Sequence, residues 1–227
     1  MEPDQHNDWH VVGATSHFGY PQPESGYARA TYDVSGYCER CGAGGVQRHP
    51  FRFRSEPKAS HSQFLQLNWV FDELFVRPEV RDVFERERVT GVGFGPALHH
   101  RTGRALEGIQ QLIILTILPP GLQTKGLQPV TCKPDNEEAR SEFAGPKRYP
   151  HDYPFCGRVK YHWRQPLVFA PHTFAEVPDI AKSHEWFGSG GAADRAILVS
   201  RRVIDLIKAR KWRGLRTEPV AVIDAAT

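Results

Sequence analysis

Two short stretches, Tyr37-Cys38-Glu39-Arg40-Cys41-Gly42 and Tyr153-Pro154-Phe155-Cys156-Gly157, share one frame although they lie in different halves of the chain. The first is a CxxCG knuckle, a turn that holds two thiolates at the spacing that suits Zn²⁺. The second keeps the frame but has Tyr153 in place of its first cysteine. Because a closed tetrahedral site needs four ligands, we expect the knuckle to draw two more from a distant segment. Such a site would tie the two halves of the protein together.

The chain has four cysteines, and the two outside the knuckle are Cys132 and Cys156. Using all of them leaves no thiol over, so the sequence predicts one structural Zn²⁺ per chain in a four-cysteine site. Its ligands would be Cys38, Cys41, Cys132 and Cys156. The long separation of Cys132 from Cys156 requires the segment 121–155 to fold back on itself.

Other interpretations of the knuckle stay open. Histidine is an alternative donor, and His49, His151 and His162 lie near the half-motifs. A redox dithiol would favour a helix starting at the motif, whereas the glycine-rich stretch 42–45 indicates a loop. Unliganded thiols are the remaining alternative. A catalytic zinc would usually show histidine or carboxylate ligands in a pattern such as HExxH, which is absent from the sequence.

The composition is that of a folded globular protein. Of the 227 residues, 40% are hydrophobic and 11% aromatic, which is too rich for a disordered chain. The 20 Gly and 18 Pro predict frequent turns and few long helices. We therefore expect a single compact α+β domain over 1–227, with a mixed sheet, a few short helices and an inserted loop-rich metal subdomain. The segments 36–50 and 121–165 would form that zinc-knuckle subregion.

Hydrophobic periodicity places the expected elements. Five residues, Phe64, Leu67, Phe71, Leu74 and Phe75, fall on one helical face, so the pattern predicts a helix over 64–88 with a second start at Pro78. An Ile-rich run predicts a buried strand over 107–118. Shorter patterns predict strands at 28–34 and 51–54 and a hairpin over 158–169.

The C-terminal quarter has the clearest pattern. A strand is expected at 196–200, and Ser200 is a plausible N-cap. Val203, Ile204 and Ile207 predict an amphipathic helix that Gly214 can stop, followed by a strand over 215–223. Together these patterns indicate mixed strands and helices without a regular βαβ repeat.

Charge and hydropathy bear on compartment and partners. The N-terminal residues are polar and acidic without an apolar signal core, and the run 112–118 is too short to span a bilayer. We therefore expect a cytoplasmic, reducing location, where cysteines are more often thiols or metal ligands than disulfides. A net charge of +3 is a mild bias, weaker than nucleic-acid binders usually show. The basic run from Arg201 to Arg216 reads as a solvated helix face.

The sequence gives no positive sign of catalysis. The glycine-rich loop 187–191 lacks the lysine of a phosphate-binding loop, and a tight turn with a close backbone approach is the better interpretation. Asp72 and Glu73 beside Trp69 do not form a recognisable acid–base pair. No nucleophile motif is present. An enzyme is therefore the less favoured interpretation.

The paired frame CERCG (38–42) and YPFCG (153–157) resembles the double-CxxCG family of myxobacterial paralogues, some of which are regarded as immunity proteins against toxins. The tail pattern from Ala196 to Val220 is similar to that family as well. The two knuckles of that family imply zinc, and here Cys132 must stand in for the cysteine replaced by Tyr153. The resemblance implies a cytoplasmic protein that binds and neutralises a cognate toxin.

A second hypothesis is that the chain is a zinc-ribbon protein, either one that binds nucleic acid or a regulatory protein. It needs basic side chains near the knuckle, and four arginines lie nearby in sequence: Arg40, Arg48, Arg52 and Arg54. Phosphate contacts would give binding a steep salt dependence. The mild net charge makes this partner the less favoured one.

Overall fold

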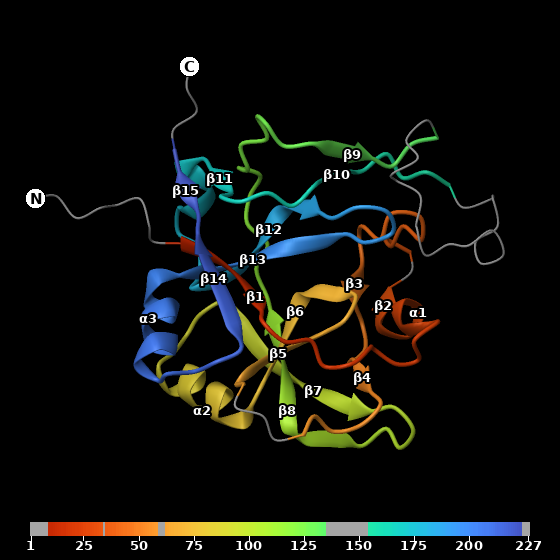
Figure 1. Ribbon diagram of the computed structural model, residues 1–227, viewed down its shortest axis with the longest axis vertical. Helices are drawn as coiled ribbons and strands as arrows, with labels where there is room; N and C mark the ends of the chain where they lie inside the picture. Colours follow the sequence, from red (N-terminus) through yellow and green to blue (C-terminus); the bar gives the residue numbers. More distant parts are fainter. Residues whose placement is uncertain (1–8, 34, 59–61, 135–153, 224–227) are drawn as a thin grey trace, which may run out of the picture.

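The computed structural model describes residues 9–33, 35–58, 62–134 and 154–223. Within these ranges the protein is a sheet-dominated α+β fold with three short α-helices (Figure 1). Two sheets carry most of the strands, and both mix parallel with antiparallel pairs. The predicted α+β class is confirmed.

The larger sheet has six strands and collects elements from both ends of the chain. Its strand order is β14 (Leu215–Pro219), β1 (Trp9–Ala14), β13 (Asp194–Ser200), β12 (Ile180–Phe187), β10 (Val159–Tyr161) and β9 (Pro129–Thr131). Neighbours run antiparallel except β10 and β12, which are parallel. The predicted strand at 196–200 is part of β13.

The second sheet has five strands from the middle of the chain. Its order is β4 (Arg52–Phe53), β7 (Val92–His99), β8 (Ala105–Ile114), β6 (Val70–Val76) and β5 (Phe64–Leu67). The predicted strands at 51–54 and 107–118 correspond to β4 and β8. Two smaller ladders pair β2 (Tyr32–Asp33) with β3 (Val46–Gln47), and β11 (Val168–Phe169) with β15 (Ala221–Val222).

The main core lies between the two sheets and is closed by two helices, α2 (Pro78–Arg86) and α3 (Arg201–Ala209). Ile197 of β13 and Leu74 of β6 belong to this cluster, together with buried residues of both helices. The alternate residues face outer layers: Leu198 packs in a second cluster and Phe75 in a third. Because both faces are buried there, the stretches 74–76 of β6 and 196–199 of β13 are continuously apolar.

The predicted helix over 64–88 is wrong in its first half. Residues 64–76 form the β5–β6 hairpin, in which Leu67 pairs with Val70 across a turn at Asn68 and Trp69. Both faces of this hairpin are buried, so its apolar residues are dense enough to match the helical spacing by coincidence. The second half is confirmed, because α2 begins with Pro78 at its first turn.

Four other expectations meet the structure with different outcomes. Ser200 caps α3 as predicted, since its hydroxyl accepts a hydrogen bond from the Val203 amide. The hairpin over 158–169 is wrong, because β10 and β11 belong to different sheets. The strand at 28–34 is wrong in part: α1 (Tyr27–Thr31) precedes the two-residue strand β2. The strand expected at 215–223 is divided into β14 and β15.

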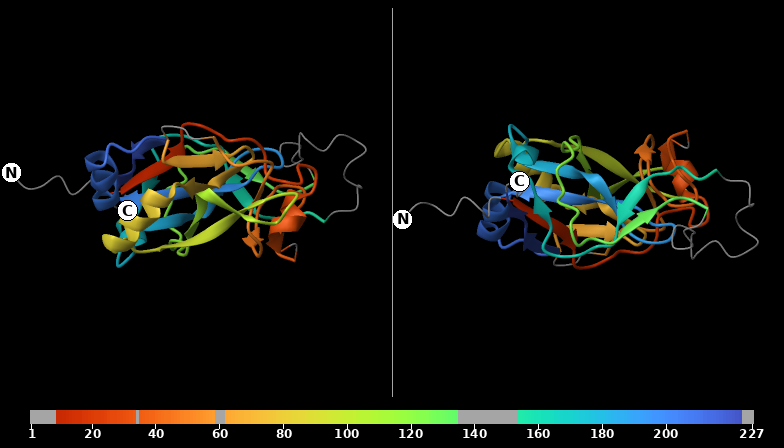
Figure 2. Two further views of the ribbon diagram at one scale, coloured as in Figure 1. Left: turned by 90° about the horizontal axis from the view of Figure 1, so that it is seen from below. Right: turned by 90° about the horizontal axis from the view of Figure 1, so that it is seen from above.

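Helices α2 and α3 gather at one end of the molecule, and the segment from α1 to β3 lies at the opposite end (Figure 2). The predicted subregion 36–50 is part of that second end. The other, 121–165, contributes β9 and β10, and its residues 135–153 lie outside the described ranges. Among the helices of the described chain, none has the length and apolar character needed to cross a membrane.

Candidate metal centre

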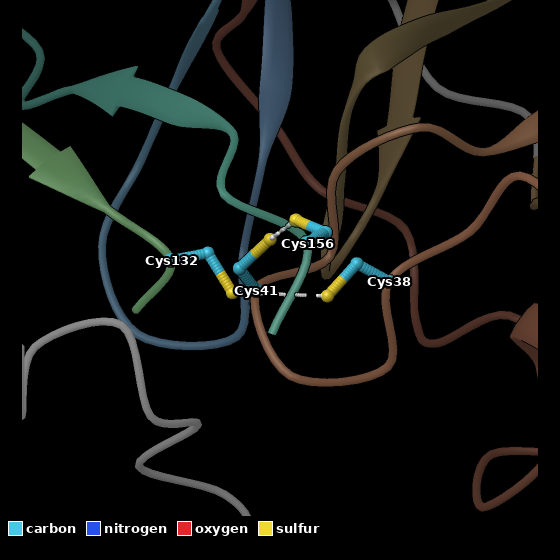
Figure 3. Close-up of side chains that lie close together, drawn as sticks. All are labelled: Cys38, Cys41, Cys132 and Cys156. Carbon is cyan, nitrogen blue, oxygen red and sulfur yellow. Dashed lines mark hydrogen bonds between the residues drawn. The ribbon is translucent and has the colours of Figure 1, made fainter. Parts of the chain in front are cut away.

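The four cysteines come together in one cluster (Figure 3). All four Sγ atoms lie within 4.8 Å of one another. The Sγ atoms of Cys38 and Cys132 are 3.9 Å apart, and those of Cys41 and Cys156 are 3.6 Å apart. Zn–S bonds of about 2.3 Å in a tetrahedron place the sulfurs about 3.8 Å apart. The cluster therefore has the dimensions of a four-cysteine metal site.

The knuckle is a tight turn that local hydrogen bonds close. The Gly42 amide donates to the Cys38 carbonyl oxygen at 2.8 Å, and the Cys38 amide donates to the Ala43 carbonyl oxygen at 2.9 Å. Gly42 has a φ of +78°, a conformation that glycine adopts without strain. The motif therefore aims both thiols to the same side of the loop.

Antiparallel pairing of β9 with β10 brings the other two cysteines together. Thr131 lies opposite Val159, and the ladder continues because the Cys132 amide donates to the Arg158 carbonyl oxygen at 2.9 Å. The Gly157 amide in turn donates to the Cys132 carbonyl oxygen at 3.0 Å. The antiparallel pairing of β9 and β10 thus places Cys132 beside Cys156, as the ligand count required. Tyr153, which occupies the missing cysteine position of the second frame, lies outside the described residues.

The sulfurs are free thiols in a shared hydrogen-bonded cluster. Their separations are well beyond the about 2.05 Å of a disulfide. A hydrogen bond from Cys41 lowers the pKa of Cys38 to about 4, and the same bond, with burial, raises the pKa of Cys41. Burial also raises the pKa of Cys132. In this arrangement one thiolate is stabilised by neighbouring thiols. A metal ion that binds there would displace the protons of the remaining thiols.

Histidine does not join the cluster in the part of the chain that the structure describes. His49 and His162 are described and lie outside the four-residue group, and His151 falls outside the described ranges. Cys38, Cys41 and Cys132 are buried, whereas Cys156 is exposed. The sequence prediction of Cys38, Cys41, Cys132 and Cys156 as one group therefore agrees with their positions.

Lys160 is a buried support of the site that the sequence did not single out. Its side chain is only 2% exposed, and its ammonium group has three acceptors. Nζ donates to the carbonyl oxygens of Cys41 at 3.0 Å, Gly190 at 2.6 Å and Ala192 at 2.6 Å. Three donors thus meet three acceptors, and β10 is fastened to both the knuckle and the β12–β13 turn. Burial lowers the pKa of this lysine.

We expect Lys160→Met to destabilise the zinc-loaded protein by about 3 kcal/mol, because three buried carbonyl oxygens lose their shared donor. Urea unfolding followed by circular dichroism measures the change. Lys125→Met, at an exposed loop position, is the matched control and should leave stability unchanged. A loss below about 1 kcal/mol would show that Lys160 does not join the three segments.

Two arginines brace the loops around the cysteines. Arg158 donates through Nη1 to the carbonyl oxygens of Gly36 and Ala43, at 2.9 Å and 3.1 Å. Arg40 places its guanidinium 4.1 Å from the ring centre of Phe155. Because thiolates that bind a divalent metal fourfold carry a net negative charge, nearby cations are favourable here.

The glycine-rich loop predicted as a tight turn packs directly on the knuckle. A Cβ atom added to Gly42 would lie 2.3 Å from the Gly191 carbonyl oxygen, closer than any real contact. Gly188 and Gly190 in the same loop have positive φ angles. Glycine at these positions thus permits the backbone of the β12–β13 turn to approach the metal loop, and the predicted close approach is confirmed.

Gly42→Ala should therefore cost about 3 kcal/mol of stability and weaken metal binding, because the methyl group meets a backbone oxygen at a strained φ. Gly103→Ala separates the two effects. Gly103 has a φ of +69° but has no atom within 4 Å of an added Cβ, so only the backbone cost of about 1 kcal/mol remains. Thermal and urea unfolding of both variants test the difference. Equal losses would contradict the steric role of Gly42.

Comparison of the chain with known protein families finds no family model that matches, and comparison with curated proteins finds no matching sequence.

Proposed function

We propose that this protein is a zinc-stabilised binding protein of the immunity type, which neutralises a cognate toxin by covering it. The observation that supports the metal is that the four Sγ atoms of Cys38, Cys41, Cys132 and Cys156 lie within 4.8 Å of one another. Soft thiolate ligands in this geometry favour zinc or an iron–sulfur centre. A single-ion site with one Sγ at each corner fits zinc directly.

The donor set favours a structural role over a catalytic one. Four thiolates fill the coordination that zinc prefers, which leaves no position for a water or a substrate. The metal would join the 38–41 loop to both strands at one end of the β9–β10 ladder. The metal would then fix the shape of the surrounding surface. The activity that we propose is recognition of a partner by that surface.

The proposed protein partner, rather than a nucleic acid, agrees with how the basic side chains near the knuckle are used. Arg48 pairs with Asp33 at 3.0 Å, and Arg40 lies over Phe155. Arg158 is held by loop carbonyl oxygens. Arginines engaged in this way are less available for phosphate contacts. Binding to DNA or RNA at low salt with a steep salt dependence would favour the zinc-ribbon alternative instead.

Two measurements test the proposal. Purified protein should contain one zinc per chain by elemental analysis. Cells that express a toxic gene adjacent to the gene for this protein should grow again when this protein is co-expressed. The two proteins should also co-purify. The double variant Cys38→Ser with Cys41→Ser is expected to lose both zinc and protection. Failure of any neighbouring toxin to bind, with zinc present, would reject the immunity role and keep the metal.

A further inference from the structure

A cavity of about 290 Å³ opens beside the metal loop, between the two sheets. The knuckle side contributes Gly42 and the stretch Gly45–Gln47, and β12 and β13 contribute the opposite wall. Aromatic side chains gather around it: Tyr27, Tyr32, Tyr37, Trp69 and Trp186. A concave site that combines several aromatic rings with convergent polar groups is a common form of binding pocket.

Three carboxyl groups line this cavity, from Asp72, Glu73 and Asp194. Lys182 neutralises part of their charge, because its Nζ lies 3.1 Å from Asp72 and 2.6 Å from Glu73. The second cation, Arg195, is engaged elsewhere. It donates to the Ser183 and His184 carbonyl oxygens and stacks on the Trp186 ring at 4.2 Å.

The pocket is therefore short of positive charge. Asp194 accepts one hydrogen bond through Oδ1, from the Phe71 amide at 3.1 Å, and Asp72 uses Oδ2 for Lys182. In the described part of the chain, the other oxygen of each carboxyl group has no hydrogen bond. Burial, with the nearby Asp72 carboxylate, raises the pKa of Asp194 to about 8. A cation placed between these groups would relieve that repulsion.

The mouth of the cavity is apolar and exposed. Four lining residues keep large fractions of their surface in solvent: Val46 55%, Trp69 40%, Leu115 66% and Ile117 54%. Clustered apolar side chains around a polar pocket are typical of protein interfaces, which bury an anchor at the centre. A free metabolite would cover little of this rim.

We propose that this pocket receives a basic side chain, arginine or lysine, that a protein partner presents with apolar neighbours. The Asp72 carboxylate would meet the charged head, and the Asp194 carboxyl group would release its proton as the cation binds. Trp69 packs against Tyr20 and Tyr27, and the part of its ring that stays in solvent would contact the alkyl stem. The inference rests on the proposed binding function and adds the chemistry of the partner.

The test uses three probes on the zinc-loaded, ¹⁵N-labelled full chain. The first is an acetylated, amidated tripeptide with arginine between two leucines. The second replaces arginine with citrulline, which keeps the shape and removes the charge. The third is agmatine, which carries a guanidinium and an ammonium group on one alkyl chain and has no peptide. Titrations follow the indole resonances of Trp69 and Trp186, which line the pocket.

We expect the arginine peptide to bind at least about tenfold tighter than the citrulline peptide, because hydrogen bonds between charged groups are stronger than those made by a neutral group. Asp72→Asn should weaken binding of the arginine peptide at least about fivefold. Leu115→Ser should weaken binding of the peptide but not of agmatine. Asp205→Asn, on the exposed face of α3, is the control and should change nothing. Leu115 is exposed, so its variant tests the site even where Asp72→Asn impairs folding.

Equal binding of the arginine and citrulline peptides, or no shift with either, would overturn the proposal. Agmatine binding as tightly as the peptide, with no effect of Leu115→Ser, would overturn the protein partner in favour of a small cation. The outcome is separable from the proposed function. If toxin neutralisation survives Asp72→Asn, the immunity role is kept and this pocket is rejected as the toxin-binding site. If the arginine peptide binds but no toxin partner is found, the pocket is kept and the immunity role is rejected.

Discussion

Cys132→Ser is expected to abolish stoichiometric zinc binding and to lower stability by about 5 kcal/mol or more, because a structural zinc contributes its binding energy to folding. Serine is a poor zinc ligand at neutral pH, and three thiolates leave the tetrahedron incomplete. Cys132 also connects β9 to the cluster, so the β9–β10 end loses its attachment to the knuckle. Elemental analysis after gel filtration and thermal unfolding measure both effects.

A chelator provides the internal control. It should lower the Tm of the wild-type protein toward that of Cys132→Ser and leave the variant unchanged. Thr131→Ser, one position earlier on the same strand, should retain zinc and lose little stability. One zinc per chain persisting in Cys132→Ser would show that the four-cysteine site is wrong.

Lys182→Met should give the second large loss, about 3 to 5 kcal/mol, because it leaves two carboxylates without their buried counter-ion. Glu73 is 6% exposed, and its other oxygen already accepts a hydrogen bond from Gln111 at 3.0 Å. Burial lowers the pKa of Lys182, but Asp72 and Glu73 outweigh it and raise that pKa overall. Urea unfolding at neutral pH measures the loss.

Neutralising the carboxyl group tests the cause. Adding Glu73→Gln to Lys182→Met should restore about 1 to 2 kcal/mol, because a neutral amide is easier to bury than an unpaired carboxylate. No recovery in the double variant would assign the loss to packing of the lysine stem rather than to charge. Lys125→Met serves again as the exposed control.

The cysteine cluster could be predicted from the sequence because ligand counting needs no fold. Four cysteines, one knuckle and a tetrahedral requirement leave one economical solution, and the structure brings those residues together. The predicted residues are thus confirmed as a cluster, and zinc itself stays a proposal. Counting ligands could not identify Lys160 as a support of the cluster. A single lysine in a short strand gives no sign that three carbonyl oxygens will surround it.

The fold was predictable where one face of an element meets solvent. The stretches that became α2 and α3 alternate with helical period, and Ser200 and Pro78 mark their starts. Residues 64–76 failed because both faces of that hairpin are buried, which removes the alternation that identifies a strand. The Lys182 cluster was also hidden, because Lys182 and Glu73 are 109 residues apart in sequence.

The placement of the four thiols has a consequence for biosynthesis. Cys41 and Cys156 are 115 positions apart, so a ribosome making about 5 to 20 residues per second needs roughly 6 to 23 s to supply the last thiol after the first pair. During that interval the nascent chain carries the two knuckle thiols, joined later by Cys132, and no complete site. A four-cysteine metal site can therefore be completed only after Cys156 has been made, and a reductant that keeps the earlier thiols reduced would raise the yield of metal-loaded protein.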